Sequence, residues 1–159
     1  MDQKKLSLWL KTILAGIGVC GLIVYLGIIP SVGNSVIAGH PEFTAWRRPW
    51  IIFLWATAVP CYAVLAMGWK IAANIGNDRS FSVDNAKLLH VIAWAAAGDA
   101  LFFFAGNVVL WLMNMNHPGV LLASLLICFA GIAVAVAAAC LSHLVRKAAA
   151  LQDENDLTV

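Results

Sequence analysis

The chain has 159 residues, of which 62% are hydrophobic and only 11% are charged, and its mean hydropathy is +0.87. A soluble domain of this size does not need so many apolar residues to fill its core, so the composition indicates an integral membrane protein. The formal net charge is +2. A nucleic-acid groove would need its cations clustered on one folded face, and we therefore expect no direct nucleic-acid binding.

Four apolar runs are each long enough to cross a hydrocarbon core, which needs about 20 helical residues. They cover roughly 12–29, 49–69, 88–113 and 119–145, and with their flanks they predict helices at about 8–30, 49–73, 83–113 and 119–151. Too little chain remains outside them for a separate soluble domain. We therefore expect one all-α transmembrane domain over 1–159, an integral membrane four-helix bundle.

The positively charged residues orient this bundle. If the N-terminus is cytoplasmic, Arg47 and Arg48 are the two outer cations, and the other eight lie on the inner side: Lys4, Lys5, Lys11, Lys70, Arg79, Lys87, Arg146 and Lys147. Because cytoplasmic loops carry the excess of lysine and arginine, this count predicts that both termini are inside. The loop between the second and third helices is then cytoplasmic too.

The two outer connections differ in length. Between the first and second helices, Gly33, Gly39 and Pro41 predict an irregular loop that breaks any long helix. Between the third and fourth helices the loop "NMNHPG" is short, so these helices are expected to be antiparallel neighbours. At the inner end, good helix formers after residue 145 predict that the fourth helix extends into the cytoplasm before an acidic tail.

Asp99 lies near the middle of the third apolar run, where a charged carboxylate costs roughly 2.5 to 3.5 kcal/mol on insertion scales. We expect it to face the bundle, either protonated or hydrogen-bonded, with Tyr62 as the best-placed hydroxyl and a carbonyl freed by Pro60 as a further acceptor. Asn107 lies eight residues later and extends this polar stripe. The stripe is either a structural hydrogen-bonding site or a site for a proton, a cation or a ligand.

Small residues along the helices are assigned to close helix packing: Gly16, Gly18, Gly21, Gly98, Gly106, Gly131, Ala135 and Ala139. A homo-oligomer contact through them stays open. All four cysteines fall inside predicted spans without C-x-x-C spacing, which favours free thiols. His40, Glu42 and His117 fall on outer loops without fixed spacing, and we expect no metal there.

The inner loop shows the signals of a well-made helix start. Ser82 is placed to cap the third helix by accepting a hydrogen bond from the amide of Asn85 or its neighbour, and Asp84 suits the first turn. Phe81 precedes the cap, where it can staple onto Ala86 or the stem of Lys87.

Two inner stretches, "DRSFSVDNAKLLHVIAW" and "LQDENDLTV", resemble the signature stretches of the YoaS-like proteins, an uncharacterised bacterial four-helix membrane family classed as a domain of unknown function. The residues that carry the resemblance are Phe81, Ser82 and Asn85 in the first stretch and Leu151, Glu154, Asn155, Asp156, Leu157, Thr158 and Val159 in the second. The resemblance implies four transmembrane helices in the bacterial cytoplasmic (inner) membrane with both signatures inside. Because members are often encoded beside a small helix-turn-helix protein, it also implies a transcription regulator as partner.

Two functions are compatible with these patterns. In the first, a sensor or scaffold presents the two signature stretches to a cytoplasmic partner, in particular a small helix-turn-helix regulator. In the second, a small oligomeric transporter or channel uses Asp99 and Asn107 on its path. No hydrolase, metalloprotease or nucleotide-binding motif is present, so we expect neither an enzyme nor a cofactor.

Overall fold

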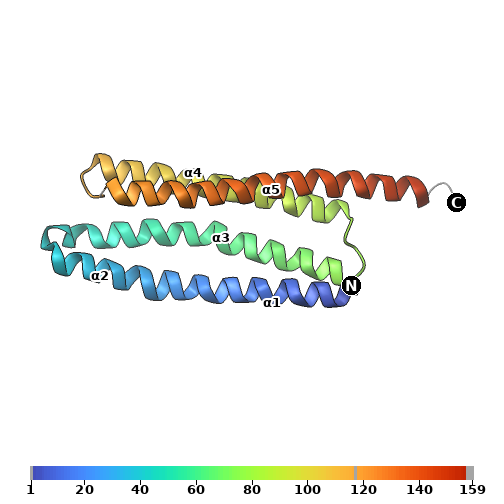
Figure 1. The fold of residues 1–159 in the computed structure, drawn as a ribbon, viewed down its shortest axis with the longest axis horizontal. Coiled ribbons are helices and arrows are strands. Elements are labelled where there is room, and N and C mark those ends of the chain that lie inside the picture. The colour runs from blue at the N-terminus through green and yellow to red at the C-terminus, as the bar shows by residue number, and fades with distance from the viewer. Residues whose placement is uncertain (1, 117, 157–159) are drawn as a thin grey trace.

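The structure is a computed structural model that describes residues 2–116 and 118–156, except for the side chains of Asp153 and Asp156. The described chain is almost entirely helical (Figure 1). Of the predicted site residues, Leu157 lies outside the described part, as do Thr158 and Val159 of the second signature stretch.

The first rod is longer than the sequence predicted. It consists of α1 (Gln3–Leu22), a π-helical segment η1 (Ile23–Ile28) and α2 (Ile29–Gly39), and a 3₁₀ helix η2 (Pro41–Trp46) follows it. The predicted loop at Gly33 is therefore wrong. Pro30 lies in the first turn of α2, where a proline is tolerated. Gly33 is buried against Trp50, whose ring would lie 3.6 Å from an added Cβ.

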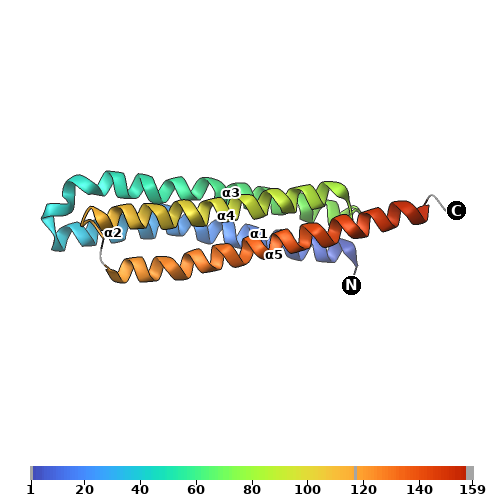
Figure 2. The ribbon, with the colours of Figure 1, turned by 90° about the horizontal axis from the view of Figure 1, so that it is seen from above.

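Three long helices complete the chain: α3 (Arg47–Gly76), α4 (Val83–Leu112) and α5 (Pro118–Asp156). We call the end of the molecule that carries the two termini and the α3–α4 loop the proximal end. The end that carries η2 and the α4–α5 turn is the distal end (Figure 1). α5 continues past the proximal ends of the other helices (Figures 1 and 2).

Helices α3 and α4 end in the same way. After α3, Asp78 has a φ of 57°, and after α4, Asn114 has a φ of 56°. The next amides reach back, from Arg79 to Asn74 O at 3.0 Å and from Met115 to Leu110 O at 2.9 Å. These are Schellman endings built on Asp and Asn, the non-glycine residues that best tolerate the left-handed region.

The first rod and the helices α3, α4 and α5 pack in an open series, in which the first and last members do not close a ring. α1 packs against α3, α3 against α4, and α4 most extensively against α5. Among the described residues, no Cα of α1 lies within 8 Å of a Cα of α4 or α5. The molecule is thus two antiparallel hairpins joined through α3 and α4 (Figures 1 and 2), and the predicted α4–α5 neighbourhood is confirmed.

Small residues allow close approach at some of the predicted positions. A Cβ at Gly106 would collide with the Phe53 ring, and one at Gly131 would lie 3.1 Å from Ala100 Cβ. At Gly16 and Gly98 an added Cβ would meet nothing within 4 Å. The packing prediction is wrong for those two glycines, because they point away from the neighbouring helix.

Four helical stretches are long and apolar enough to cross a membrane: Gln3–Gly39, Pro41–Gly76, Val83–Leu112 and Pro118–Gln152. The most apolar window of the first has no buried residue, and those of the last two are each 17% buried. Side chains so exposed and so apolar suit a lipid solvent. The prediction of an all-α protein with four helices long and apolar enough to span a membrane is confirmed.

Candidate functional site

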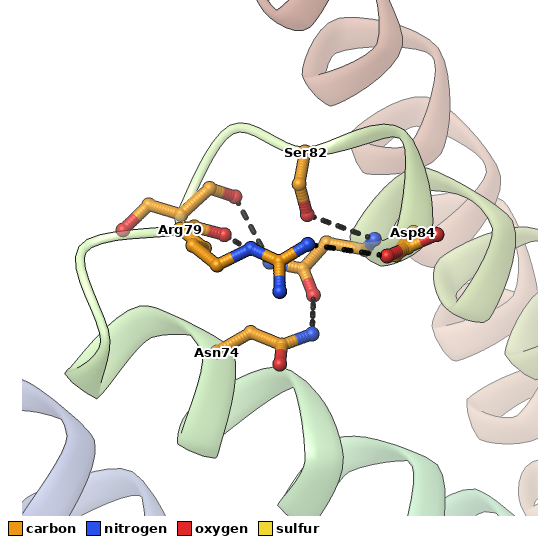
Figure 3. A network of polar contacts seen from close by, with 6 residues as sticks. Asn74, Arg79, Ser82 and Asp84 are labelled. Atoms are coloured by element: carbon orange, nitrogen blue, oxygen red, sulfur yellow. Dashed lines mark hydrogen bonds and ion pairs between the residues drawn. The ribbon is translucent and has the colours of Figure 1, made fainter.

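A network of polar contacts holds the proximal loop between α3 and α4 (Figure 3), and Asn85 makes most of its hydrogen bonds. Its Nδ2 donates to the carbonyl oxygens of Arg79 and Ser80, both at 3.0 Å, and its Oδ1 accepts from Asn74 Nδ2 at 2.7 Å. Its side chain is 1% exposed. Asn85 therefore positions the loop and presents no surface of its own to a partner.

Ser82 begins α4 as the sequence predicted. Its Oγ accepts a hydrogen bond from the backbone amide of Asn85 at 3.2 Å (Figure 3). An exposed ion pair of 3.4 Å between Arg79 and Asp84 spans the loop. Since exposed pairs contribute little, the cap and the buried Asn85 account for most of the order of this loop.

Buried serine hydroxyls connect the helices at the proximal end. Ser7 Oγ donates to Ala72 O at 2.6 Å, which joins α1 to α3, and Ser142 Oγ donates to Ala86 O at 2.7 Å, which joins α5 to α4. Ala72 and Ala86 are 1% and 0% exposed. Such short contacts between small residues hold the row of helices together at this end.

A shallow cleft of about 240 Å³ lies between the loop and α5. Phe81 and Ser82 line it from the loop, and Ala149 and Gln152 line it from α5, so residues far apart in the sequence meet here. The Phe81 side chain is 59% exposed. It lines the cleft and is not buried as the expected staple would be.

The end of α5 brings the second signature stretch to the same end of the molecule. Leu151 is 55% exposed. Glu154 and Asn155 are exposed in the last two turns, and the helix ends at Asp156. The proximal end therefore presents apolar side chains from two elements beside polar ones.

The second predicted site centres on Asp99 in α4. Its Oδ2 accepts a hydrogen bond from Cys61 Sγ on α3 at 3.4 Å. Its Oδ1 is buried and has no hydrogen-bond partner among the described residues. Cys61 in turn lies 3.9 Å from the hydroxyl of Tyr25, which is 3.1 Å from Thr57 Oγ1.

Tyr62 does not partner Asp99, and that prediction is wrong. Its hydroxyl donates to Gly18 O on α1 at 2.7 Å, where Gly21 leaves room for the ring. Successive residues on a helix point about 100° apart. Cys61 therefore faces α4 while Tyr62 faces α1, and depth in the membrane alone did not distinguish them.

Asn107 belongs to the distal end and not to the Asp99 site. It is 4% exposed. Its Nδ2 donates to Phe103 O at 2.9 Å, and its Oδ1 accepts from Asn116 Nδ2 at 3.1 Å. Because its amide is satisfied by its own helix and by the α4–α5 turn, the predicted stripe from Asp99 to Asn107 is two separate sites.

Sequence reasoning missed two features. One is Tyr25, which the π-helical segment η1 places beside Thr57 and Cys61, and π-helical turns often occur at functional sites. The other is a distal pocket lined by η2, α2 and the α4–α5 turn. No group of three potential metal ligands is present among the described residues, and His117 lies outside them.

The helices and their exposed apolar surface define a multi-pass membrane protein. Residues 31–159 match the family described as "Protein of unknown function (DUF2975)", and the chain belongs to this family. It is also 32% identical over 155 residues to the "Uncharacterized membrane protein YoaS" of Bacillus subtilis (strain 168), covering 96% of this chain and 97% of that protein. No solved structure matches the chain significantly.

Proposed function

We propose that this protein is a sensor or scaffold of the bacterial cytoplasmic membrane whose proximal end binds a protein partner inside the cell. Eight of the ten lysine and arginine residues flank the proximal end, which favours a cytoplasmic location for both termini. α5 then extends from the membrane into the cytoplasm. A small helix-turn-helix regulator is the proposed partner.

The observation that carries the proposal is the proximal cleft. It joins Phe81 and Ser82 of one signature stretch to Gln152 of the other. Phe81 and Leu151 leave more than half of their side-chain surface exposed, at 59% and 55%. Exposed apolar side chains beside a cleft and among polar groups are typical of a protein contact.

The residues have different roles in this proposal. Phe81 and Leu151 supply apolar contact, and Glu154 with Asn155 supplies polar contact at the edge. Asn85 and Ser82 hold the loop in place through their hydrogen bonds. The second signature stretch adds Asp156 and Leu157 to the proposed contacts on the basis of the sequence alone.

Co-purification from mild detergent with a co-expressed small helix-turn-helix regulator, the partner that the family resemblance implies, tests the proposal. We expect Leu151→Ser, or removal of residues 152–159, to reduce recovery of the regulator at least fivefold. Leu144→Ser is the matched control, because Leu144 is 61% exposed on the same helix and lies before the second signature stretch, whereas Leu151 begins that stretch. Equal recovery with both serine variants and the truncated chain would contradict the proposal.

Transport is the second candidate function, and the unpartnered Oδ1 of Asp99 favours it. An open row of helices encloses no path by itself, so transport would require an oligomer. Solute flux into liposomes that is lost in Asp99→Asn would support this candidate. Absence of flux together with tail-dependent recovery of the regulator would support the sensor or scaffold.

A further inference from the structure

A pocket of about 530 Å³ opens at the distal end, opposite the proximal cleft. One wall comes from α2, η2 and the start of α3, and the other comes from the end of α4, the following turn and the start of α5. This volume is within the range of about 300–1,000 Å³ that is usual for small-molecule sites.

The pocket lies where α2 and η2 are separated from α4 and α5. Among the described residues, no Cα of α2 or η2 lies within 8 Å of a Cα of α4 or α5. Both hairpins nevertheless contribute lining side chains. A molecule in the pocket would contact both, and it would bridge α2 and η2 to the α4–α5 hairpin.

The walls of the pocket are mainly apolar. Phe43, Trp46 and Trp50 contribute aromatic rings, and Val36 and Ile37 contribute aliphatic side chains. Val36 and Trp46 are 46% and 40% exposed. Such walls favour a ligand with an aromatic or aliphatic body, because its burial would remove apolar surface from water on both sides.

Among the described residues that line the pocket, Arg47 is the one cationic side chain that is not paired with a carboxylate. The carboxylate of Glu42 lies 3.1 Å from His40 Nδ1. Arg47 donates from Nε to Asn34 Oδ1 at 3.0 Å, and its terminal nitrogens make no hydrogen bond or ion pair with the described residues. The Asn34 contact holds a guanidinium whose remaining donors match the geometry of an anion.

We propose that this pocket binds a small anionic amphiphile, with its apolar body between the aromatic walls and its acidic group on Arg47. The ligand comes either from the surrounding leaflet, as a single-chain lipid acid, or from the aqueous side, as an aromatic acid. The inference does not depend on the partner proposed for the proximal end.

Tryptophan quenching in phosphatidylcholine nanodiscs tests this with the full chain. Bromododecanoate probes the lipid source, bromobenzenesulfonate probes the aqueous source, and bromododecanol is the uncharged control probe. We expect saturable quenching by at least one of the anions, weakened about tenfold or more in Arg47→Met, as loss of a charge-assisted contact predicts. Arg48→Met should leave the affinity within about twofold, because Arg48 does not line the pocket.

Two further variants separate the pocket from nonspecific partitioning. Val36→Trp should fill the pocket and abolish saturable quenching, whereas Val32→Trp should not, since Val32 is equally exposed at 46% and lies outside the lining. Glu42→Gln should not weaken anion binding, because it removes a like charge. Equal effects of the two arginine variants, equal affinity for the alcohol, or no saturable quenching by either anion would overturn the proposal.

Discussion

The two ends of this protein are built differently. At the proximal end, buried hydrogen bonds from Ser7, Ser142 and Asn85 join neighbouring helices and fix the α3–α4 loop. At the distal end, α2 and η2 face the α4–α5 hairpin across a pocket, and among the described residues no Cα of α2 or η2 lies within 8 Å of a Cα of α4 or α5. Order at the proximal end and an opening at the distal end suit the sensor that we propose, because a ligand could bind at the distal end while the proximal end presents a defined surface.

The largest expected effect on stability concerns the proximal end. Asn85→Ala would leave the carbonyls of Arg79 and Ser80 and the amide of Asn74 without their buried partner, at a cost of about 2 kcal/mol or more. Thermal unfolding in detergent should show a clearly lower midpoint than for the wild-type protein. Asn77→Ala, in the exposed part of the same loop, is the control and should have a small effect. Similar midpoints for the two variants would show that the loop does not depend on this network.

The next effect tests the contact between the hairpins in the distal half. Gly106→Ala would place a methyl group against Phe53, and such overpacking costs typically 1–3 kcal/mol. Gly98→Ala, two turns away on the same helix, meets nothing within 4 Å and should be neutral or stabilising. Unfolding midpoints of both variants check this difference. The Phe53→Ala background should remove the penalty at Gly106, and a penalty that persists there would assign it to another cause.

Asp99 lies between the two ends, and its substitution should raise stability. Asp99→Leu removes a buried oxygen that has no partner, so we expect a gain of about 1–2 kcal/mol. The unfolding midpoint of the purified protein measures it, with Cys61→Ala as the companion variant that removes the hydrogen bond to Oδ2. A large loss of stability in Asp99→Leu would mean that the carboxyl group makes a stabilising contact within the fold.

The smallest expected effect on stability comes from the backbone of the α3–α4 loop. Asp78 has a φ of 57°, so Asp78→Gly should gain about 0.5–1 kcal/mol by relieving the left-handed conformation. Asn77, with a φ of −100°, is the matched control, and Asn77→Gly should gain nothing. Chemical unfolding curves of the two variants compare them directly, and equal shifts would reject the explanation.

The sequence predicted those features of the fold that depend on the apolar solvent or on neighbouring residues in the chain. Apolar length predicted four spanning helices, and the Ser82 cap was read from neighbouring residues alone. The sequence-based predictions failed where the contacts of a side chain depend on the rotation of its helix about the axis or on packing against residues distant in sequence. Cys61 and Tyr62 are adjacent in sequence yet face different helices, and Gly33 continues a helix in which it packs against Trp50 of α3.

The distal pocket lay beyond local patterns for the same reason. Its walls combine residues from 33 to 50 with residues from 110 to 120, and only the arrangement of the two hairpins brings them together. The proximal cleft likewise joins the loop after α3 to the far end of α5. The signature stretches predicted which residues lie there, but not that Asn85 is buried among them.

Cysteine labelling in intact cells tests the central claim, that the two ends work on opposite sides of the membrane. In a chain whose four native cysteines are replaced, one cysteine is introduced at exposed Asn77 or at exposed Thr44. A membrane-impermeant maleimide should label the distal position in intact cells and the proximal position only after permeabilisation. Labelling of the proximal position in intact cells would contradict the account.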